Sequence, residues 1–300
     1  MTIALELGLL YAVMALGVYL TYRVLDFPDL TVDGSFTTGA ATCAIMIVSG
    51  IPVWVAMISG TVAGMIAGAV TGLLHVWGKI NPLLAGIITQ IALYSINLRI
   101  MGNKANVPLL RQETLFSGLR ADGLLGTWVS VAFFALAVAV VCALVYWFLG
   151  TQYGVALRAT GDNELMARSQ GINTGTTKIV GLMISNGLVA FCGTLVAQYS
   201  GFADISMGIG LIVAGLASVI VGQAIFGMTA VWQAVVAAAL GSIIYRSVIQ
   251  LAISQGFNPN DMKLISAVLV VLALVLPQWG PLKRIRIRRS QANAIAEGAK

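Results

Sequence analysis

The sequence predicts an all-α polytopic membrane protein, a bundle of eight or nine transmembrane helices in a single domain over residues 1–300. Hydrophobic residues make up 59% of the chain and charged residues only 9%, and the mean hydropathy is +0.93. These values exclude a soluble domain of this length. Most apolar segments are near the ~20 residues that a helix needs to cross hydrocarbon. The nine candidate segments are 3–24, 35–50, 52–77, 82–101, 127–149, 178–200, 206–226, 229–253 and 264–280.

The first segment is expected to remain in the protein as a helix. Glu6 precedes most of it where a signal peptide would carry basic residues, the segment is long enough to span, and no small-residue cleavage site follows. The three cysteines fall inside apolar runs without metal-type spacing, so they are interpreted as small buried hydrophobic residues.

The charge distribution predicts the topology. Six of the seventeen cationic residues lie in the tail at 282–300, and the positive-inside rule places such a tail in the cytoplasm. Membrane topology therefore explains the net charge of +6 without a nucleic-acid partner. Counting back through four spans places the polar loop 150–178 in the cytoplasm as well, in agreement with its own basic residues. The N-terminus is outside if segment 35–50 crosses the membrane and inside if that segment turns back.

Segment 35–50 is the weakest of the nine and is expected to form part of a broken or re-entrant element within 25–50. It is short, Pro28 breaks the helix before it, and Asp26, Asp29 and Asp33 lie close together. Irregular backbone at membrane depth occurs where it is buried in protein or lines a cavity, so this element is a candidate wall of a translocation path. The alternative is a cytoplasmic turn whose aspartates face water.

The helix expected at 52–77 carries a stripe of small residues. Gly60, Gly64, Gly68 and Gly72 recur at every fourth position, which places them on one face and allows another backbone to approach closely. Few polar side chains lie inside the spans. Each of them either lines a translocation path or makes an interhelical hydrogen bond. With the two aspartates, the candidates for the path are Asp29, Asp33, Gln90, Asn97, Asn186 and Gln198.

The chain shows no catalytic constellation. His75 is the only histidine, so a His-rich metal site is excluded, and no metal site is predicted. No G-x-x-x-x-G-K-[ST] stretch is present to form a nucleotide-binding P-loop. If the protein uses ATP, another subunit hydrolyses it.

The polar loop 150–178 has a pattern of its own. Residues 153–160 favour a helix, Gly161, Asp162 and Asn163 break it, and residues 164–170 favour a second, short helix. Asp162 or Asn163 caps the second helix, and Gly171 stops it. Two turns are too few to be stable alone in water, so something must hold this helix. Its partly apolar face, formed by Leu165, Met166 and Ser169, either enters a groove on a partner or packs back on the chain itself.

The run YGVALRATGDNELMARSQGINTGTTK at 153–178 resembles the cytoplasmic coupling loop of ABC-transporter permeases of the branched-chain amino acid and ribose type. That family has a tract G-x-x-x-R-A-x-G-x-N followed by A-x-x-x-G-I-N. The residues at 11–40 and 213–227 are similar to further family segments, so the resemblance covers most of the chain. The chain departs from the family in lacking the additional N-terminal helix of the sugar-type members, in its acidic cluster at 26–33, and in the pair Gln223-Ala224. The loop pattern is matched by Gly154, Arg158, Ala159, Gly161, Asn163, Ala167, Gly171, Ile172 and Asn173.

The resemblance implies the membrane subunit of an importer in a bacterial cytoplasmic (inner) membrane, within a subgroup linked with aromatic amino-acid uptake. It implies a dimer of two permease chains, cytoplasmic ATPase subunits that bind ATP and Mg, and an extracytoplasmic solute-binding protein. This chain itself would hold no cofactor, would not be an enzyme, and would contact membrane lipid. The residues implied to couple the ATPase are Arg158, Gly161, Asp162, Asn163, Glu164, Leu165, Met166, Arg168, Gly171 and Ile172.

Two other classes are weighed beside this one. An ion-coupled secondary transporter would use the acids at 26–33 and Arg246 as coupling groups. A membrane scaffold would transport nothing. The sequence names no solute.

Overall fold

A computed structural model of the chain describes residues 2–110, 112–227 and 230–255, together with 264, 267, 268 and 271. Most of these residues are helical and only two three-residue strands occur among them, which confirms the all-α membrane fold. Seven helices are long and apolar enough to cross a membrane. They are α1 (Thr2–Tyr19), which continues as the π-helical turn η1 (Leu20–Val24), α2 (Thr31–Val48), α3 (Val53–Val76), α4 (Pro82–Ile100), α6 (Trp128–Gly150), α9 (Thr174–Ser200) and α11 (Val231–Ser254).

The shorter elements connect the long helices or lie at their ends. They are α5 (Ser117–Ala121), α7 (Gln152–Asp162), α8 (Glu164–Ser169), α10 (Leu211–Phe226) and the antiparallel strands β1 (Asn106–Pro108) and β2 (Phe202–Asp204). The small β1 and β2 sheet was not expected from the sequence. Its strands are three residues each and pair across almost a hundred positions, so no local pattern indicates them.

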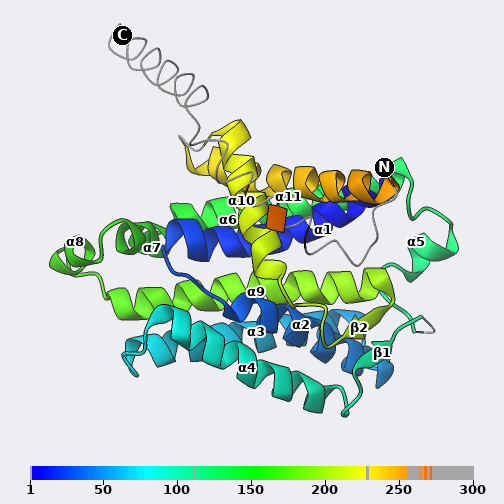
Figure 1. Ribbon diagram of the computed structural model, residues 1–300, viewed down its shortest axis with the longest axis horizontal. Coiled ribbons are helices and arrows are strands. Elements are labelled where there is room, and N and C mark those ends of the chain that lie inside the picture. The colour runs from blue at the N-terminus through cyan, green and yellow to red at the C-terminus, as the bar shows by residue number, and fades with distance from the viewer. Residues whose placement is uncertain are drawn as a thin grey trace, which may run out of the picture.

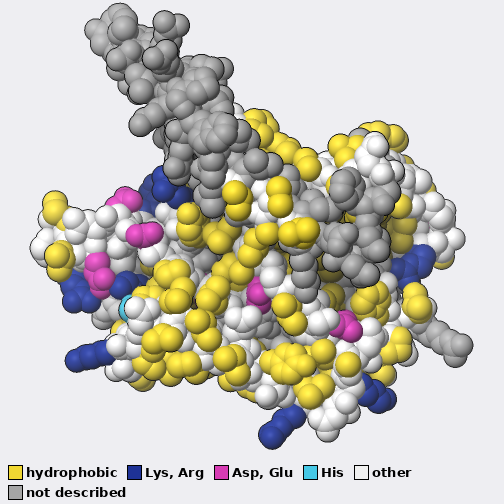
Figure 2. Space-filling model, viewed as in Figure 1, with side chains coloured by type: hydrophobic (Ala, Val, Ile, Leu, Met, Phe, Trp, Pro, Cys, Tyr) yellow, Lys and Arg dark blue, Asp and Glu magenta, His cyan; other side chains and the backbone are white. Residues whose placement is uncertain are grey.

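The long helices run side by side along the long axis of the molecule (Figure 1). Helices α7 and α8 lie at one end of the bundle, and α5, the two strands and the N-terminus lie at the other. Helix α10 runs across the direction of the others. Figure 2 shows acidic and basic side chains together over the α7 and α8 end, while hydrophobic side chains cover most of the middle. The two ends of the bundle therefore correspond to the two sides of the membrane.

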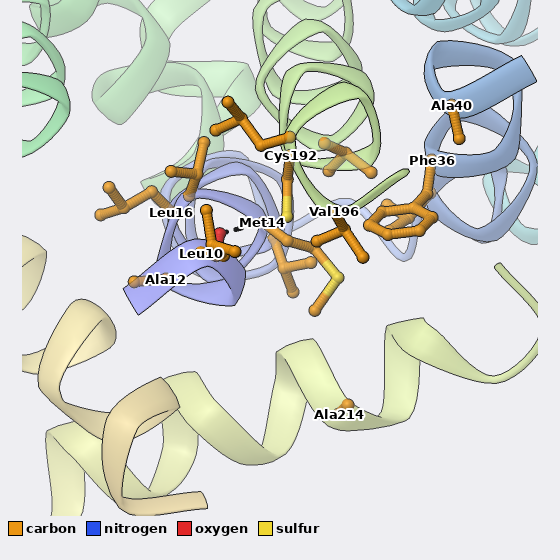
Figure 3. Packing of buried hydrophobic residues seen from close by; sticks show 14 of the residues in the cluster. Leu10, Ala12, Met14, Leu16, Phe36, Ala40, Cys192, Val196 and Ala214 are labelled. Atoms are coloured by element: carbon orange, nitrogen blue, oxygen red, sulfur yellow. Dashed lines mark hydrogen bonds between the residues drawn. The ribbon is translucent and has the colours of Figure 1, made fainter. Parts of the chain in front are cut away.

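Helices α1 and α9 form the centre of the bundle. Helix α1 packs against α6, α9, α10 and α11, and α9 also packs against α2 and α3. Figure 3 shows Leu10 and Met14 of α1 beside Cys192 and Val196 of α9, with Phe36 of α2 next to them. All five side chains are buried. In so apolar an interior, a buried polar side chain costs free energy unless it is hydrogen-bonded, so each such side chain has a structural or functional reason.

The glycine stripe of α3 faces α9. A methyl group added at Gly64 would lie 2.2 Å from the Cβ of Ala190, and one at Gly68 would lie 2.3 Å from the carbonyl oxygen of Leu182. Gly60 and Gly72 approach α9 in the same way, one near each end of the contact. The small residues thus bring the two backbones together, which is the packing mode that such stripes allow in membranes.

The interruption expected within 25–50 lies at 25–30, and α2 itself is continuous from Thr31. Pro28 stands in this connection and Asp26 adopts φ +52°. Helices α1 and α2 both have spanning length, so a break inside α2 is not found. Asp26 is exposed, whereas Asp29 and Asp33 are 3% and 7% exposed. A simple turn with all three aspartates facing water is therefore wrong.

The span expected at 206–226 is shorter than predicted. Helix α10 begins only at Leu211, because Gly210 before it adopts φ +84° and residues 205–210 are not helical. Its 16 residues leave it below spanning length. The expected span 264–280 and the tail 282–300 lie outside the described residues, apart from 264, 267, 268 and 271.

Candidate functional site

The end of the bundle that carries α7 and α8 is the first candidate site. Asn163 caps α8: its Oδ1 accepts a hydrogen bond from the backbone N–H of Met166 at 3.0 Å. Gly171, with φ +82°, ends the short helix, and the N–H of Ile172 closes it by donating to the carbonyl of Ala167 at 3.1 Å. The sequence allowed Asp162 or Asn163 as the cap. The structure selects Asn163, and Asp162 is the exposed last residue of α7.

Glu164 fastens α8 to the start of α9. One carboxylate oxygen accepts from Arg168 Nη2 at 2.7 Å, and the other accepts from Lys178 Nζ at 2.7 Å. Thr174 joins them, since its hydroxyl accepts from Arg168 Nε at 2.8 Å and lies 3.2 Å from Glu164 Oε1. The hydrogen bond from Lys178 lowers the pKa of the Glu164 carboxyl below its ordinary value of 4.5, against a smaller opposing effect of burial. A two-turn helix that could not persist alone is thus held by an ion-pair network.

Leu165 and Met166 project away from this anchor. Their side chains are 80% and 62% exposed, whereas Ala167 on the opposite face is buried. The sequence left open whether these apolar residues pack back on the chain. They do not contact its buried core, and they form an exposed apolar pair on a fixed helix, the arrangement used in helix-in-groove recognition.

Helix α7 is pressed against the end of α1. A Cβ added at Gly161 would lie 2.0 Å from the carbonyl oxygen of Val24, the last residue of η1. Leu157 of α7 is buried and touches the position of Gly181 on α9. Gly161 therefore faces into the chain. Arg158 lies one turn earlier, at a cleft between α6, α7 and the start of α11.

The second candidate site is a polar network where α2 begins. Asn186 of α9 donates through Nδ2 to Asp29 Oδ2 at 2.7 Å, and its Oδ1 accepts from the Ser35 hydroxyl at 2.7 Å. Asp29 also accepts from the backbone N–H of Thr31 at 2.9 Å, and Thr31 contacts Thr71 of α3 at 2.7 Å between hydroxyl oxygens. All of these side chains are buried. The network joins α2, α3 and α9 within the apolar bundle.

Asp33 lies one turn further along α2 and acts on α10. Its two carboxylate oxygens accept from the N–H groups of Gly210 and Ile212, each at 2.7 Å. The first N–H groups of a helix lack intrahelical partners, and the helix dipole favours a negative charge there. Asp33 therefore caps a helix that begins inside the bundle, from a position 177 residues away in sequence.

The other predicted path residues divide between two places. Asn97 donates to the carbonyl of Gly34 at 3.3 Å, and its Oδ1 is buried without a hydrogen-bond partner among the described residues. Gln90, half-buried on the same helix, lies against Gly34 as well. Gln198 lies apart from these residues, twelve positions beyond Asn186, which is about 18 Å along α9 at 1.5 Å per residue. It accepts a hydrogen bond from the N–H of Leu115 at 2.9 Å. Five of the six candidates thus gather around residues 29–35.

Two charged side chains lie outside the predicted path and coupling-loop residues: Glu6, and Arg246, which the sequence offered only as a coupling group of the alternative ion-coupled carrier. Glu6 is 0% exposed and accepts hydrogen bonds from the Tyr199 hydroxyl at 2.6 Å, from the Gly126 N–H at 2.8 Å and from the Ser130 hydroxyl. It fastens α1 to α6 and α9 at the end opposite α8. Arg246 lies over the Tyr11 ring, 3.6 Å from its centroid. Glu6 and Arg246 could have been singled out in the sequence as charged residues inside apolar runs, but the sequence does not reveal their partners.

A lateral groove of about 700 Å³ lies between α1, α3, α6 and α9 and is lined almost wholly by apolar side chains. It offers no polar group to orient a solute, so its size alone does not make it a transport site. No cluster of three or more His, Cys, Asp or Glu residues that could hold a metal ion occurs in the described part of the chain.

Comparison with known proteins places the whole membrane region in one family. The family model described as the permease component of branched-chain amino acid transport systems matches residues 1–275. A tyrosine transport system permease protein of Clostridioides difficile is 45% identical over 268 residues, which cover 89% of this chain and 88% of that protein. An uncharacterized protein of Rickettsia prowazekii, RP368, is 34% identical over 90% of this chain and 95% of its own length.

A more distant relative is the autoinducer 2 import system permease protein LsrC of Salmonella paratyphi B. It is 29% identical over 223 residues, which cover 72% of this chain and 60% of LsrC. No solved structure matches the chain.

Proposed function

The chain belongs to the family of permease components of branched-chain amino acid transport systems, and from this membership we propose that it forms the membrane path of an importer driven by separate ATPase subunits. The observation that carries the proposal is the exposed pair Leu165 and Met166 on an anchored helix. The pair would enter a groove on the ATPase. Asn163, Glu164, Arg168, Gly171 and Ile172 would hold the helix in place, with Asp162 at the rim of the contact.

The contacts of α7 and α8 supply routes from the docking site into the bundle. Displacement of α8 would pull on the start of α9 through Glu164 and Lys178. Displacement of α7 would press on the end of η1 through the close approach of Gly161 to Val24. Helices α1 and α9 form the centre of the bundle, so both routes lead to its core. ATP and Mg would be bound by the partner ATPase subunits.

The polar network around α2 is our candidate for the moving part of the path. Asp29, Asn186 and Ser35 link α2 to α9, and Asp33 links α2 to the start of α10. Non-helical backbone at 205–210 leads to this point from β2. Helices interrupted inside a bundle are a recurring element of transporter paths. We propose that shifts of α9 re-arrange these bonds, with Gln90 and Asn97 on the adjoining face of α4.

One relative supports a solute class. The C. difficile relative is a tyrosine transport permease, and we propose an aromatic amino acid as the solute here. An extracytoplasmic binding protein would deliver it to the end of the bundle that carries α5 and the strands. Two copies of the chain would face each other, so that one docking helix serves each of two ATPase subunits. The basic tail and the loop 150–178 orient the chain with the α8 end in the cytoplasm of the bacterium.

Reconstitution tests the proposal. The chain is placed in proteoliposomes with the ATPase and binding protein of its own system, and uptake of labelled tyrosine, leucine and ribose is measured with and without internal ATP. We expect tyrosine uptake that requires both partners and ATP, and that survives collapse of the ion gradients. Uptake by the chain alone, driven by an ion gradient, would instead establish the ion-coupled carrier and refute the proposal.

A further inference from the structure

A cleft of about 470 Å³ opens at the end of α6 next to α7 and the start of α11. The side chains that give it its chemistry are Arg158, Tyr146, Trp147 and Trp232. It lies where α6 ends at Gly150, on the same side of the membrane as α8. The coupling role expected for Arg158 does not explain this position, because its side chain lines a cleft at the membrane boundary.

The cleft is chemically suited to an anion. Arg158 Nε is buried and has no hydrogen-bond partner among the described residues. The two ion pairs found in the described part of the chain both involve Glu164, so Arg158 belongs to neither. None of the described residues that line the cleft is acidic. A guanidinium presents a planar fork of donors that matches phosphate oxygens, and a buried donor without a partner is costly.

Three aromatic side chains add donors at the same place. Tyr146, Trp147 and Trp232 are all largely exposed and line the cleft beside Arg158. Their hydroxyl and indole N–H groups supply hydrogen bonds, and their rings are of the kind that gathers at the level of lipid headgroups. A free inorganic anion would need the donors but would gain nothing from the aromatic rings.

The exposed face of α6 next to the cleft indicates that the bound anion carries an apolar chain. Leu136, Val140, Leu144 and Trp147 are exposed at intervals of four, four and three residues, which places them in one stripe along the helix. The stripe is apolar and ends at the cleft. In a membrane it contacts hydrocarbon, so an occupant with a charged head at Arg158 and an acyl chain along α6 satisfies both features.

We propose that this cleft binds the phosphate headgroup of an anionic phospholipid, with an acyl chain lying along the exposed stripe of α6. Arg158 contacts the phosphate, and Tyr146, Trp147 and Trp232 surround the headgroup. Assignment to the cytoplasmic leaflet rests on the proposed function through the orientation of α8, whereas the binding itself does not. The site would tie the junction between α6 and α7 to the lipid composition of the membrane.

The test uses the full chain in lipid nanodiscs with lipids brominated on their acyl chains, which quench nearby tryptophans. Quenching by brominated phosphatidylglycerol is compared with quenching by brominated phosphatidylcholine, and the Trp147→Phe, Trp232→Phe double variant is subtracted to isolate the cleft. We expect about a fivefold preference for phosphatidylglycerol, the ratio that corresponds to the ~1 kcal/mol of one basic residue near the surface. Arg158→Gln should abolish the preference, and Arg158→Lys should retain most of it.

The matched control is Lys79→Gln, which removes one exposed cation between α3 and α4 on the same side of the membrane. It should leave the preference unchanged. Equal quenching by the two lipids in the native chain, or an undiminished preference in a folded Arg158→Gln variant, overturns the proposal. Loss of the preference on addition of millimolar inorganic phosphate also overturns it, because the site would then take a free anion. If Arg158→Gln fails to fold, the native preference and its retention in Arg158→Lys decide the question.

Discussion

Replacing Leu165 and Met166 together by alanine should weaken docking of the ATPase without disturbing the permease. Both side chains are exposed in the isolated chain, at 80% and 62%, so burying them at an interface removes most of their surface from water. Full burial of such a side chain contributes ~1.5–3 kcal/mol. Scaled by the exposed fractions and summed, the two side chains contribute roughly 2–4 kcal/mol, which corresponds to a loss of affinity of about 30- to 1,000-fold. Alanine preserves α8, because it is the best helix former.

The assay is the dissociation constant between the purified permease and its ATPase subunit, measured beside ATP-dependent uptake in proteoliposomes. Ser169→Ala on the same helix is the matched control, since it removes only an exposed hydroxyl that bonds the carbonyl of Met166. It should change the affinity by less than about twofold, as expected for a surface substitution. Native-like affinity in the double alanine variant would refute the reasoning, because the exposed pair would then not be the docking surface.

Three further outcomes are expected. Asp33→Asn keeps the shape of the side chain but removes the negative charge at the start of α10, so it should lower the free energy of unfolding by about 1–3 kcal/mol in a denaturation assay. Asp26→Asn is the control and should leave that free energy unchanged, because Asp26 is exposed. Gly161→Ala should lower the free energy of unfolding by about 1–3 kcal/mol and reduce uptake, because the added Cβ would lie 2.0 Å from the carbonyl oxygen of Val24. Gly150→Ala is the control and should change neither, because the space around Gly150 is open. Equal stability of the two variants would contradict the packing of α7 on η1. Because the pKa of Glu164 is lowered in the folded state, its ion pairs with Arg168 and Lys178 are fully present above pH 4.5 and are lost only as the pH falls through the lower, folded-state pKa. The fluorescence anisotropy of a label on α8 should therefore drop at acid pH. Glu164→Gln should remove that transition.

The two short helices of the loop 150–178 could be predicted because their signals are local. The short helix, its stop at Gly171 and the choice of Asp162 or Asn163 as its cap follow from residues within ten positions of each other, whereas the selection of Asn163 and the exposure of Leu165 and Met166 required the structure. What held the short helix was not predicted, although the need for a support was. The support comes from Lys178 and Thr174 on the next helix, and neither a distance nor a partner can be read from the sequence.

The intramembrane site was predicted only as a set of residues. The sequence singles out Asp29, Asp33 and Asn186 as costly polar groups in apolar runs. It cannot show that Asp29 bonds Asn186 or that Asp33 caps α10, since both pairings join residues more than 150 positions apart. The start of α10 at Leu211, later than predicted, also depends on a distant residue. Hydropathy continues through 206–210, but the left-handed Gly210 and the distant carboxylate set the first helical residue.

The placement of Gly161 and Arg158 also required the structure. Both belong to the loop pattern that resembles the coupling loop, and the resemblance implied that both couple the ATPase. Gly161 faces Val24 inside the chain, and Arg158 lines a cleft at the membrane boundary. The loop pattern thus combines exposed residues such as Leu165 with residues that fix the loop to its own bundle, and only the tertiary packing separates the two groups.

We propose that the exposed face of α8 is the surface through which the ATPase drives this permease. The most direct test is cross-linking from a cysteine at Leu165 to the ATPase subunit, in a variant whose three native cysteines are replaced. We predict a cross-link at this position whose yield changes between ATP-bound and nucleotide-free states, and none from a cysteine at Lys79 on the same side of the membrane. Absence of the cross-link at Leu165, or equal yields at both positions, would show that α8 is not the ATPase-binding surface.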